Sequence, residues 1–183
     1  GDVYKRQALG FAISWINKFS EYYNEIDVVT LNKGDTRSLN QNINVYSHES
    51  DSFNKLQKFV VLRKIVKKLI KDNEYEYCLS HMTAALLVVG STIFGFRNLK
   101  TVLWYTHIGP STIFKKIILR LGANIADKIV TASYNSFPYN MKKVITIGHA
   151  ISYNNFFRDT ADGKSKDFLI LSRISTIKNI DES

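Results

Sequence analysis

The stretch LKTVLWYTHIGPSTIFKKIILRLGANIADKIVTAS, residues 99–133, decides the fold of this chain. The apolar run 99–106 predicts a short strand, and 128–132 predicts another. Between them, Gly109-Pro110 marks a turn and residues 111–121 carry a helical pattern that we expect Ser111 to cap. A strand, a helix and a strand at this spacing favour a parallel sheet with right-handed crossovers.

The same alternation continues on both sides of this stretch. Further strands are predicted at 26–31, 43–47, 75–81 and 144–147, and helical patterns lie at 8–23 and 55–71. Residues 78–96 carry no formal charge, but several hydroxyls and glycines make them too polar for a membrane span; we expect a strand ending near His81 and then a buried helix. The predicted fold class is α/β, a Rossmann-like parallel sheet flanked by helices.

Composition and cysteine usage agree with an ordinary globular chain. Its 183 residues are 45% hydrophobic, enough for one domain with a real core. The single Cys78 excludes an internal disulfide, which suits a reducing cytoplasm, and its apolar strand context indicates an inert core thiol. Phosphate-loop, Gly-x-Gly-x-x-Gly, Cys-x-x-Cys and His-Glu-x-x-His motifs do not occur, so NTPase, dinucleotide and zinc classes have no motif support.

Basic residues give the chain a net charge of +9. Many lie in the amphipathic pattern 55–71, whose lysines gather beside an apolar arc. We expect either a packed helix with a solvated lysine face or docking on anionic lipid. Lys115, Lys116 and Arg120 of the next basic helix would add to such a surface. Nucleic-acid binding is not expected, because no binding motif accompanies the charge. The lysines proposed for membrane docking are Lys64, Lys67, Lys68 and Lys71.

Near the carboxyl end, two cations follow a predicted strand. Residues 168–171 read as a buried strand, and Arg173 and Lys178 follow it, five residues apart. A loop that leaves the carboxyl end of a strand borders the ligand crevice of an open α/β sheet. Two cations there can neutralise a diphosphate.

Four segments resemble the family-4 glycosyltransferases, enzymes with two facing Rossmann-like domains of the GT-B type. Leu103-Trp-Tyr-Thr-His107 is similar to the strand that ends in the family's active-site histidine. Ala126–Ser133 resembles its "aD.iv..S" strand. Residues 143–151 with Phe156-Phe157 resemble the crossing into the second domain, and Leu171–Lys178 resembles the "vgR....KG" that opens the donor-binding half. Ser152 and Asn179 depart from the family's usual Asp and Gly.

The resemblance implies transfer of a sugar from a nucleotide sugar to a hydroxyl acceptor, with retained anomeric configuration. The acceptor would be lipid-linked, a polysaccharide or another envelope glycan. The resemblance places His107 at the reacting centre and implies that Arg173 and Lys178 bind the leaving diphosphate. No metal or other cofactor is expected, because such enzymes stabilise the leaving group with basic side chains and helix dipoles. The location expected is cytoplasmic, at or near the inner face of the membrane.

Other residues are candidates for lining the cleft. His81 ends its strand on the same side of the sheet as His107, and His149 lies at the crossing, where a structural hydrogen bond is its expected role. Gly109, Ser133 and Gly148 are further candidates for the cleft wall. His48 lies in a polar loop, where we expect surface exposure.

The domain plan expected is a fragment of such an enzyme, truncated at both ends. Residues 1–7 resemble a translated sequencing adaptor. Residues 8–151 would form the acceptor-side domain without its first strand, 152–167 the interdomain linker and 168–183 the start of the donor domain. A fragment of this extent is expected to be inactive alone. Two alternatives remain: a non-catalytic Rossmann-like binding domain, or another GT-B-like enzyme such as an epimerase or a phosphorylase.

Overall fold

Apolar runs and helical patterns alternate along the chain as the sequence predicts. The computed structural model describes residues 12–30, 33–47, 54–106, 109–110 and 112–148. The strands in these residues are β1 Ile26–Thr30, β2 Ile43–Ser47, β3 Tyr77–His81, β4 Lys100–Trp104, β5 Lys128–Thr131 and β6 Val144–Thr146. The helices are an unlabelled helical segment at 12–20, α2 Lys55–Asp72, α3 Ala84–Gly90 and α4 Ile113–Ile125, with short 3-10 turns η1 Phe96–Asn98 and η2 Tyr134–Ser136.

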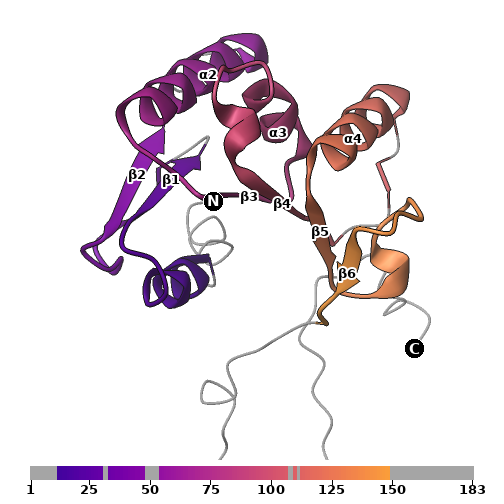
Figure 1. Ribbon diagram of the computed structural model, residues 1–183, viewed down its shortest axis with the longest axis horizontal. Helices are drawn as coiled ribbons and strands as arrows, with labels where there is room; N and C mark the ends of the chain where they lie inside the picture. Colours follow the sequence, from indigo (N-terminus) through magenta and orange to yellow (C-terminus); the bar gives the residue numbers. More distant parts are fainter. Residues whose placement is uncertain (1–11, 31–32, 48–53, 107–108, 111, 149–183) are drawn as a thin grey trace, which may run out of the picture. The chain divides into compact units, whose positions relative to one another are not determined.

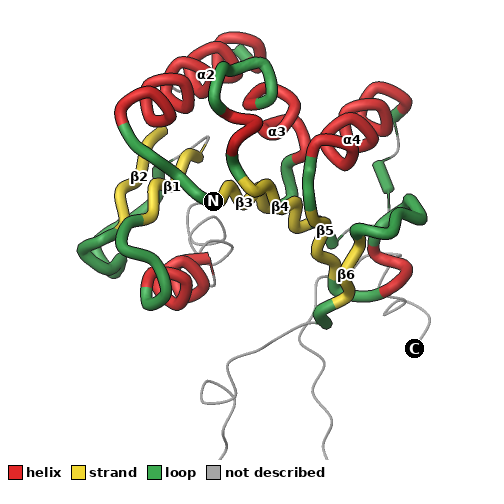
Figure 2. The backbone as a smooth tube through the Cα atoms, in the orientation of Figure 1, coloured by secondary structure: helices red, strands yellow, loops and turns green. Residues whose placement is uncertain are grey.

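Four strands form a parallel sheet in the order β3-β4-β5-β6. In this register Leu103 of β4 pairs with Ile129 of β5, and both side chains are fully buried. Leu87 of α3 and Leu119 of α4 belong to the same apolar core. Figure 2 shows α2, α3 and α4 in red along one side of the yellow strands. The α/β fold with parallel strands flanked by helices is therefore confirmed.

The described strands form two sheets, whereas a single sheet was expected. β1 and β2 pair in parallel with each other and do not pair with β3. Side chains join the two sheets instead: the Tyr75 hydroxyl donates a hydrogen bond to the Asp27 carboxylate, and the rings of Tyr23 and Tyr77 meet edge to face. In the doubly wound order, the first strand lies at the centre of the sheet and joins its two halves. The described residues between 12 and 148 contain no strand that joins the β1-β2 pair to β3 (Figure 1).

Polar side chains cap the amino ends of the two long helices. At the start of α2, Asn54 and Gln57 form a reciprocal capping box. The prediction that Ser111 caps the next helix is wrong: Thr112 has extended backbone, and its hydroxyl accepts the Lys115 N–H. α4 then runs to Ile125, four residues beyond the predicted end. Gly122, the residue after Leu121, does not end the helix, because it is a buried helical residue that packs closely against Ala84.

Asp127 ties the amino ends of β4 and β5 together. Its carboxylate accepts hydrogen bonds from the Thr101 N–H at 2.7 Å and the Thr101 hydroxyl at 2.8 Å. The bond from the Thr101 N–H, and after it the bond from the Thr101 hydroxyl, are the main reasons that the pKa of Asp127 lies below its ordinary value. Asp127 therefore lies at the edge opposite to the one where the strands end, and its place in the sequence motif is structural.

Replacing Asp127 with Ala is expected to lower the free energy of unfolding by about 1–2 kcal/mol, because the N–H of the buried Thr101 loses its acceptor. The pKa of Asp127 is lower in the folded chain than in the unfolded chain. This stabilisation is therefore present when the pH is above the pKa of the unfolded chain, and it is lost as the pH falls through the pKa of the folded chain. Urea unfolding at neutral and acidic pH measures both effects. Glu74→Ala, at an exposed position, is the control, and equal losses in the two variants would contradict the prediction.

The uncharged stretch 78–96 folds as β3, the seven-residue α3 and η1. In the part of the chain that the structure describes, no helix has the length and apolar character needed to cross a membrane.

Candidate functional site

Polar groups gather where the four strands of the larger sheet end. Parallel strands end at the same edge of a sheet, and in an open α/β sheet that edge borders the ligand crevice. β3 ends at His81, β4 leads to Thr106, β5 leads to Ser133 and β6 leads to Gly148. The structure thus brings three of the predicted cleft residues, His81, Ser133 and Gly148, to one edge.

His81 lies against two tryptophan rings. Trp15 of the helical segment 12–20 stacks on Trp104 with ring centroids 4.4 Å apart, and the imidazole of His81 meets each ring edge-on at 5.3 Å. The residue remains open to solvent on its other side. Partial burial against the indoles lowers the pKa of His81. A neutral imidazole at neutral pH can donate one hydrogen bond and accept another.

The imidazole of His81 is expected to titrate below its ordinary value of 6.5. Because the folded chain binds this proton less tightly than the unfolded chain, folding stability is greatest above pH 6.5 and declines as the pH falls through the folded pKa. Proton NMR of the imidazole resonances measures the midpoint, with His81→Asn for assignment. In Trp15→Ala the midpoint should return toward 6.5, since the ring that excludes water is gone; an unchanged midpoint in that variant would show that Trp15 does not cause the lowered pKa.

The turn after His81 has an unusual backbone. Met82 adopts a left-handed conformation with φ of 60°, which costs roughly 1–2 kcal/mol for a residue with a side chain. β4 and the turn itself hold it: the Met82 N–H donates to the Trp104 carbonyl at 2.7 Å, and the Ser80 hydroxyl donates to the Thr83 carbonyl at 2.7 Å. The Thr106 hydroxyl also contacts the Met82 sulfur at 3.4 Å. This turn sets the position of His81 at the edge.

The remaining described candidates differ in what they contribute. Gly109 packs against the ring of Pro138, and a Cβ at Gly109 would come within 3.0 Å of it. The Ser133 hydroxyl is exposed and shares a 2.6 Å hydrogen bond with Ser136. Gly148 has φ of +77° with open space around it, so glycine is required there for its backbone and not for lack of room.

Four candidates lie outside the described residues: His107, His149, Arg173 and Lys178. So do His48, the expected linker 152–167 and the expected strand 168–171. The roles that the resemblance implies for these residues stay predictions. Thr106 and Gly109, on either side of the His107 segment, are both described, and Thr106 follows the carboxyl end of β4.

The helix α2 presents its lysines to solvent. Lys64, Lys67, Lys68 and Lys71 are exposed, whereas Leu62 is buried and Val66 and Ile70 pack against the core. Part of the apolar side of α2 is thus covered by the core. Cys78 also packs against the core, and burial raises the pKa of its thiol to about 11, which keeps it protonated and unreactive at neutral pH.

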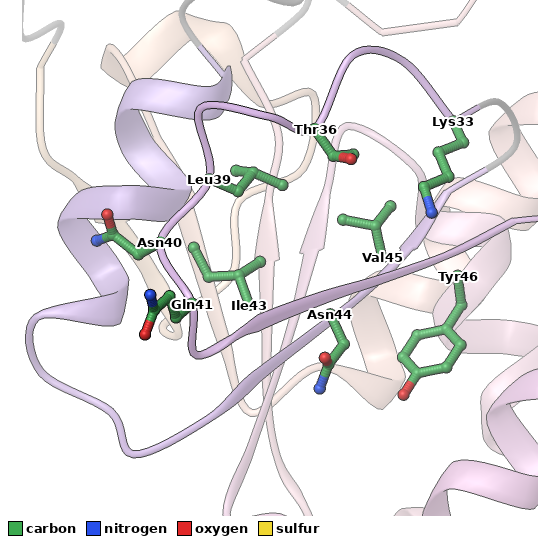
Figure 3. A pocket seen from close by; sticks show the side chains of 9 residues that line it. All are labelled: Lys33, Thr36, Leu39, Asn40, Gln41, Ile43, Asn44, Val45 and Tyr46. Atoms are coloured by element: carbon green, nitrogen blue, oxygen red, sulfur yellow. The ribbon is translucent and has the colours of Figure 1, made fainter.

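Two hollows lie beside β2, which belongs to the smaller sheet. One of about 470 Å³ runs along β2 and the loop before it, and another of about 460 Å³ lies between β2 and α2. Figure 3 shows the side chains that line the first hollow, among them Lys33, Asn40 and Asn44. Its lining contains no histidine, cysteine or carboxylate. The second hollow has Lys33, Lys68 and Asp72 in its lining but no histidine or cysteine. The presence of an imidazole therefore favours the edge that carries His81 as the candidate site.

Within the described ranges, no three His, Cys, Asp or Glu residues come together as a metal site would require. The expectation of a metal-independent reaction stays a prediction, since several site candidates lie outside those ranges.

Sequence reasoning missed the aromatic and backbone parts of this site. Trp15, Trp104 and Met82 were not predicted to lie there. The chain has only two tryptophans, which is a weak signal, and nothing in the sequence around Met82 indicates a left-handed residue, because glycine or asparagine is the usual sign.

Comparison with known proteins identifies a family. A family described as glycosyl transferase 4-like matches this chain over residues 6–133. No curated protein and no solved structure shows a significant match.

Proposed function

The chain belongs to the glycosyl transferase 4-like family, and from this premise we propose that it supplies the acceptor-side domain of an enzyme that moves a sugar from a nucleotide sugar to a hydroxyl group. The family match is the observation that carries this proposal. The family match supports membership in a glycosyltransferase family. The observed strand order supports the Rossmann-like sheet. The nucleotide sugar, the hydroxyl acceptor and the retention of configuration are proposed.

The carboxyl edge of the larger sheet supports the location of the acceptor. His81 offers a neutral imidazole there, beside the indole rings of Trp15 and Trp104. His107, three residues after β4 in the sequence, is proposed to lie at the reacting centre. In a GT-B enzyme the crevice lies between two domains, so one domain provides a wall and not an enclosed pocket.

The leaving diphosphate is proposed to be held by Arg173 and Lys178. A guanidinium presents parallel N–H groups that match phosphate oxygens, and lysine adds a point charge. Both interactions strengthen as negative charge grows on the departing group, so they act in the transition state. No step in this scheme requires a metal ion. The acceptor is proposed to be a lipid-linked or other envelope glycan, handled on the cytoplasmic side of the membrane.

Product analysis with a labelled nucleotide sugar tests this proposal in the protein that carries this domain. Transfer of label to a hydroxyl acceptor, with release of nucleoside diphosphate, is the expected result. Label recovered as an isomeric nucleotide sugar would indicate an epimerase, and label recovered as a sugar phosphate would indicate a phosphorylase. Tight binding of the donor without any product would favour the non-catalytic binding domain. Each of the last three results would overturn the proposal.

A further inference from the structure

Helix α4 carries apolar side chains on the side that faces solvent. Ile113, Ile117 and Leu121 follow one another at spacings of four residues and are 77%, 52% and 44% exposed, with Phe114 beside them at 73%. The buried residues of the helix are Leu119, Gly122 and Ala123, which at 100° per residue lie on the opposite side. The helix is therefore apolar on both its inner and its outer face.

An apolar outer face of this kind indicates that something covers it. Helices at the surface of a soluble domain normally turn a polar side to water, and a contiguous apolar patch marks an interaction site. α2 is closer to the usual pattern, since Leu62 is buried, Val66 and Ile70 pack against the core, and Val60 is its one large apolar residue exposed among those described. The two helices flank the same core, so the difference is a property of α4 itself.

The charges on α4 indicate which kind of partner fits. Lys115, Lys116 and Arg120 are all exposed, and residues 112–126 contain no aspartate or glutamate. Arg120 lies over the ring of Tyr139, and the Tyr139 hydroxyl donates to the Lys116 carbonyl, which holds this flank of the helix in place. An apolar stripe with Lys116 and Arg120 along one flank, on a helix without acidic residues, matches a surface with acyl chains beneath negative headgroups.

We propose that α4, through Ile113, Phe114, Ile117 and Leu121 with the flanking cations, docks this domain on an anionic membrane. The site differs from the lysine face of α2, which offers charge without an exposed apolar stripe. The inference deepens the proposed function: the first turn of α4 follows the Gly109-Pro110 turn that leaves β4, so the docked end of the helix is the end nearest the edge that carries His81. A lipid-linked acceptor would then be presented to that edge at the bilayer surface.

Vesicle flotation of the 183-residue chain tests the proposal without donor or acceptor. The chain should float with vesicles of phosphatidylglycerol and phosphatidylcholine in equal parts, and much less with phosphatidylcholine alone. Phe114→Ser combined with Ile117→Ser should lower the partition coefficient by about tenfold or more, since two apolar side chains no longer leave water. Lys115→Gln with Lys116→Gln should lower it too, and added salt should then have less effect.

Two control variants separate this surface from others. Val60→Ser alters an exposed apolar residue of α2, and Lys64→Gln with Lys67→Gln and Lys68→Gln removes charge from the same helix; both should float as the unaltered chain does. The proposal is overturned if the Phe114 and Ile117 variant floats normally, or if binding is lost only in the α2 lysine variant. It is also overturned if light scattering shows a dimer that Phe114→Ser dissociates, because a second copy would then cover the face.

Circular dichroism and thermal unfolding check that the exposed substitutions leave the fold intact. Failure of flotation would leave the proposed transfer reaction standing, since the two are measured separately. Conversely, normal flotation with no sugar transfer would count against the proposed function and not against this surface.

Discussion

Replacing Arg173 with Ala in the protein that carries this domain is expected to lower kcat by more than about tenfold. The reason lies in how the charge of the leaving group changes. A nucleotide sugar already carries its diphosphate, but cleavage of the sugar–phosphate bond adds negative charge to the oxygen that departs. A fixed guanidinium beside it interacts more strongly with the transition state than with the bound donor, so its loss appears in kcat more than in KM.

Two further variants sharpen this expectation. Arg97→Ala removes an exposed arginine from η1, at the opposite edge of the sheet before β4, and should leave kcat unchanged. Lys178→Ala should lower kcat as well, and the double variant should lose less than the product of the two single losses if both cations contact one diphosphate. Steady-state assays with varied donor measure each effect. Unchanged kinetics in Arg173→Ala would remove the residue from the proposed donor site.

The strands were predictable from the sequence because each is a short run dense in apolar residues. In β4, Leu103 is buried between its neighbours on both sides, as an interior strand of a parallel sheet requires. The predicted strand 99–106 contains the observed Lys100–Trp104. Strand ends were less certain, since Tyr105 is also buried and makes a backbone hydrogen bond to Val130 without extending the strand.

Contacts between distant segments were not predictable. The stacking of Trp15 on Trp104 joins residues far apart in the chain, and neither tryptophan has a neighbour that indicates its partner. The division into two sheets was also missed, because local patterns identify strands but not which edges pair. At the candidate site, the polar residues at strand ends were predictable from the parallel topology, whereas the left-handed Met82 was not.

The outer face of α4 illustrates a further limit. From the sequence, the basic residues of this helix predicted a positively charged surface. Its apolar residues were compatible with a helix that packs on a sheet. Burial assigns Leu119 and Ala123 to the core and leaves Ile113 and Phe114 in solvent. Periodicity alone cannot separate two apolar faces of one helix, because both satisfy the same helical spacing.

Gly122→Val is expected to lower the free energy of unfolding by about 3 kcal/mol, at the upper end of the usual loss for an overpacked core. Gly122 is where α4 crosses closest to α3: a Cβ there would lie 2.7 Å from the Ala84 carbonyl oxygen and 2.8 Å from the Ala84 Cβ. The nearest obstacle is backbone, so no rotamer change relieves it. The higher helix propensity of valine over glycine offsets only a few tenths of a kcal/mol.

The consequence of this clash should extend to the candidate site, because Ala84 is the first residue of α3 and the Met82 turn with His81 comes directly before it. Moving α3 away from α4 would pull on that turn and open the imidazole to water, so the pKa of His81 should rise toward its ordinary value as stability falls. Urea unfolding and the NMR titration of His81 measure the two effects on the same protein. Asn124→Val, at an exposed position of α4, adds the same side chain without the clash and should change neither the free energy of unfolding nor the pKa of His81.

A pair of smaller substitutions tests the same contact. Adding Ala84→Gly to Gly122→Ala should recover part of the stability lost in Gly122→Ala, since one of the two closest contacts disappears. If Gly122→Val proves as stable as the unaltered chain, the close approach of α3 and α4 at this point is wrong, and with it the argument that this crossing positions His81.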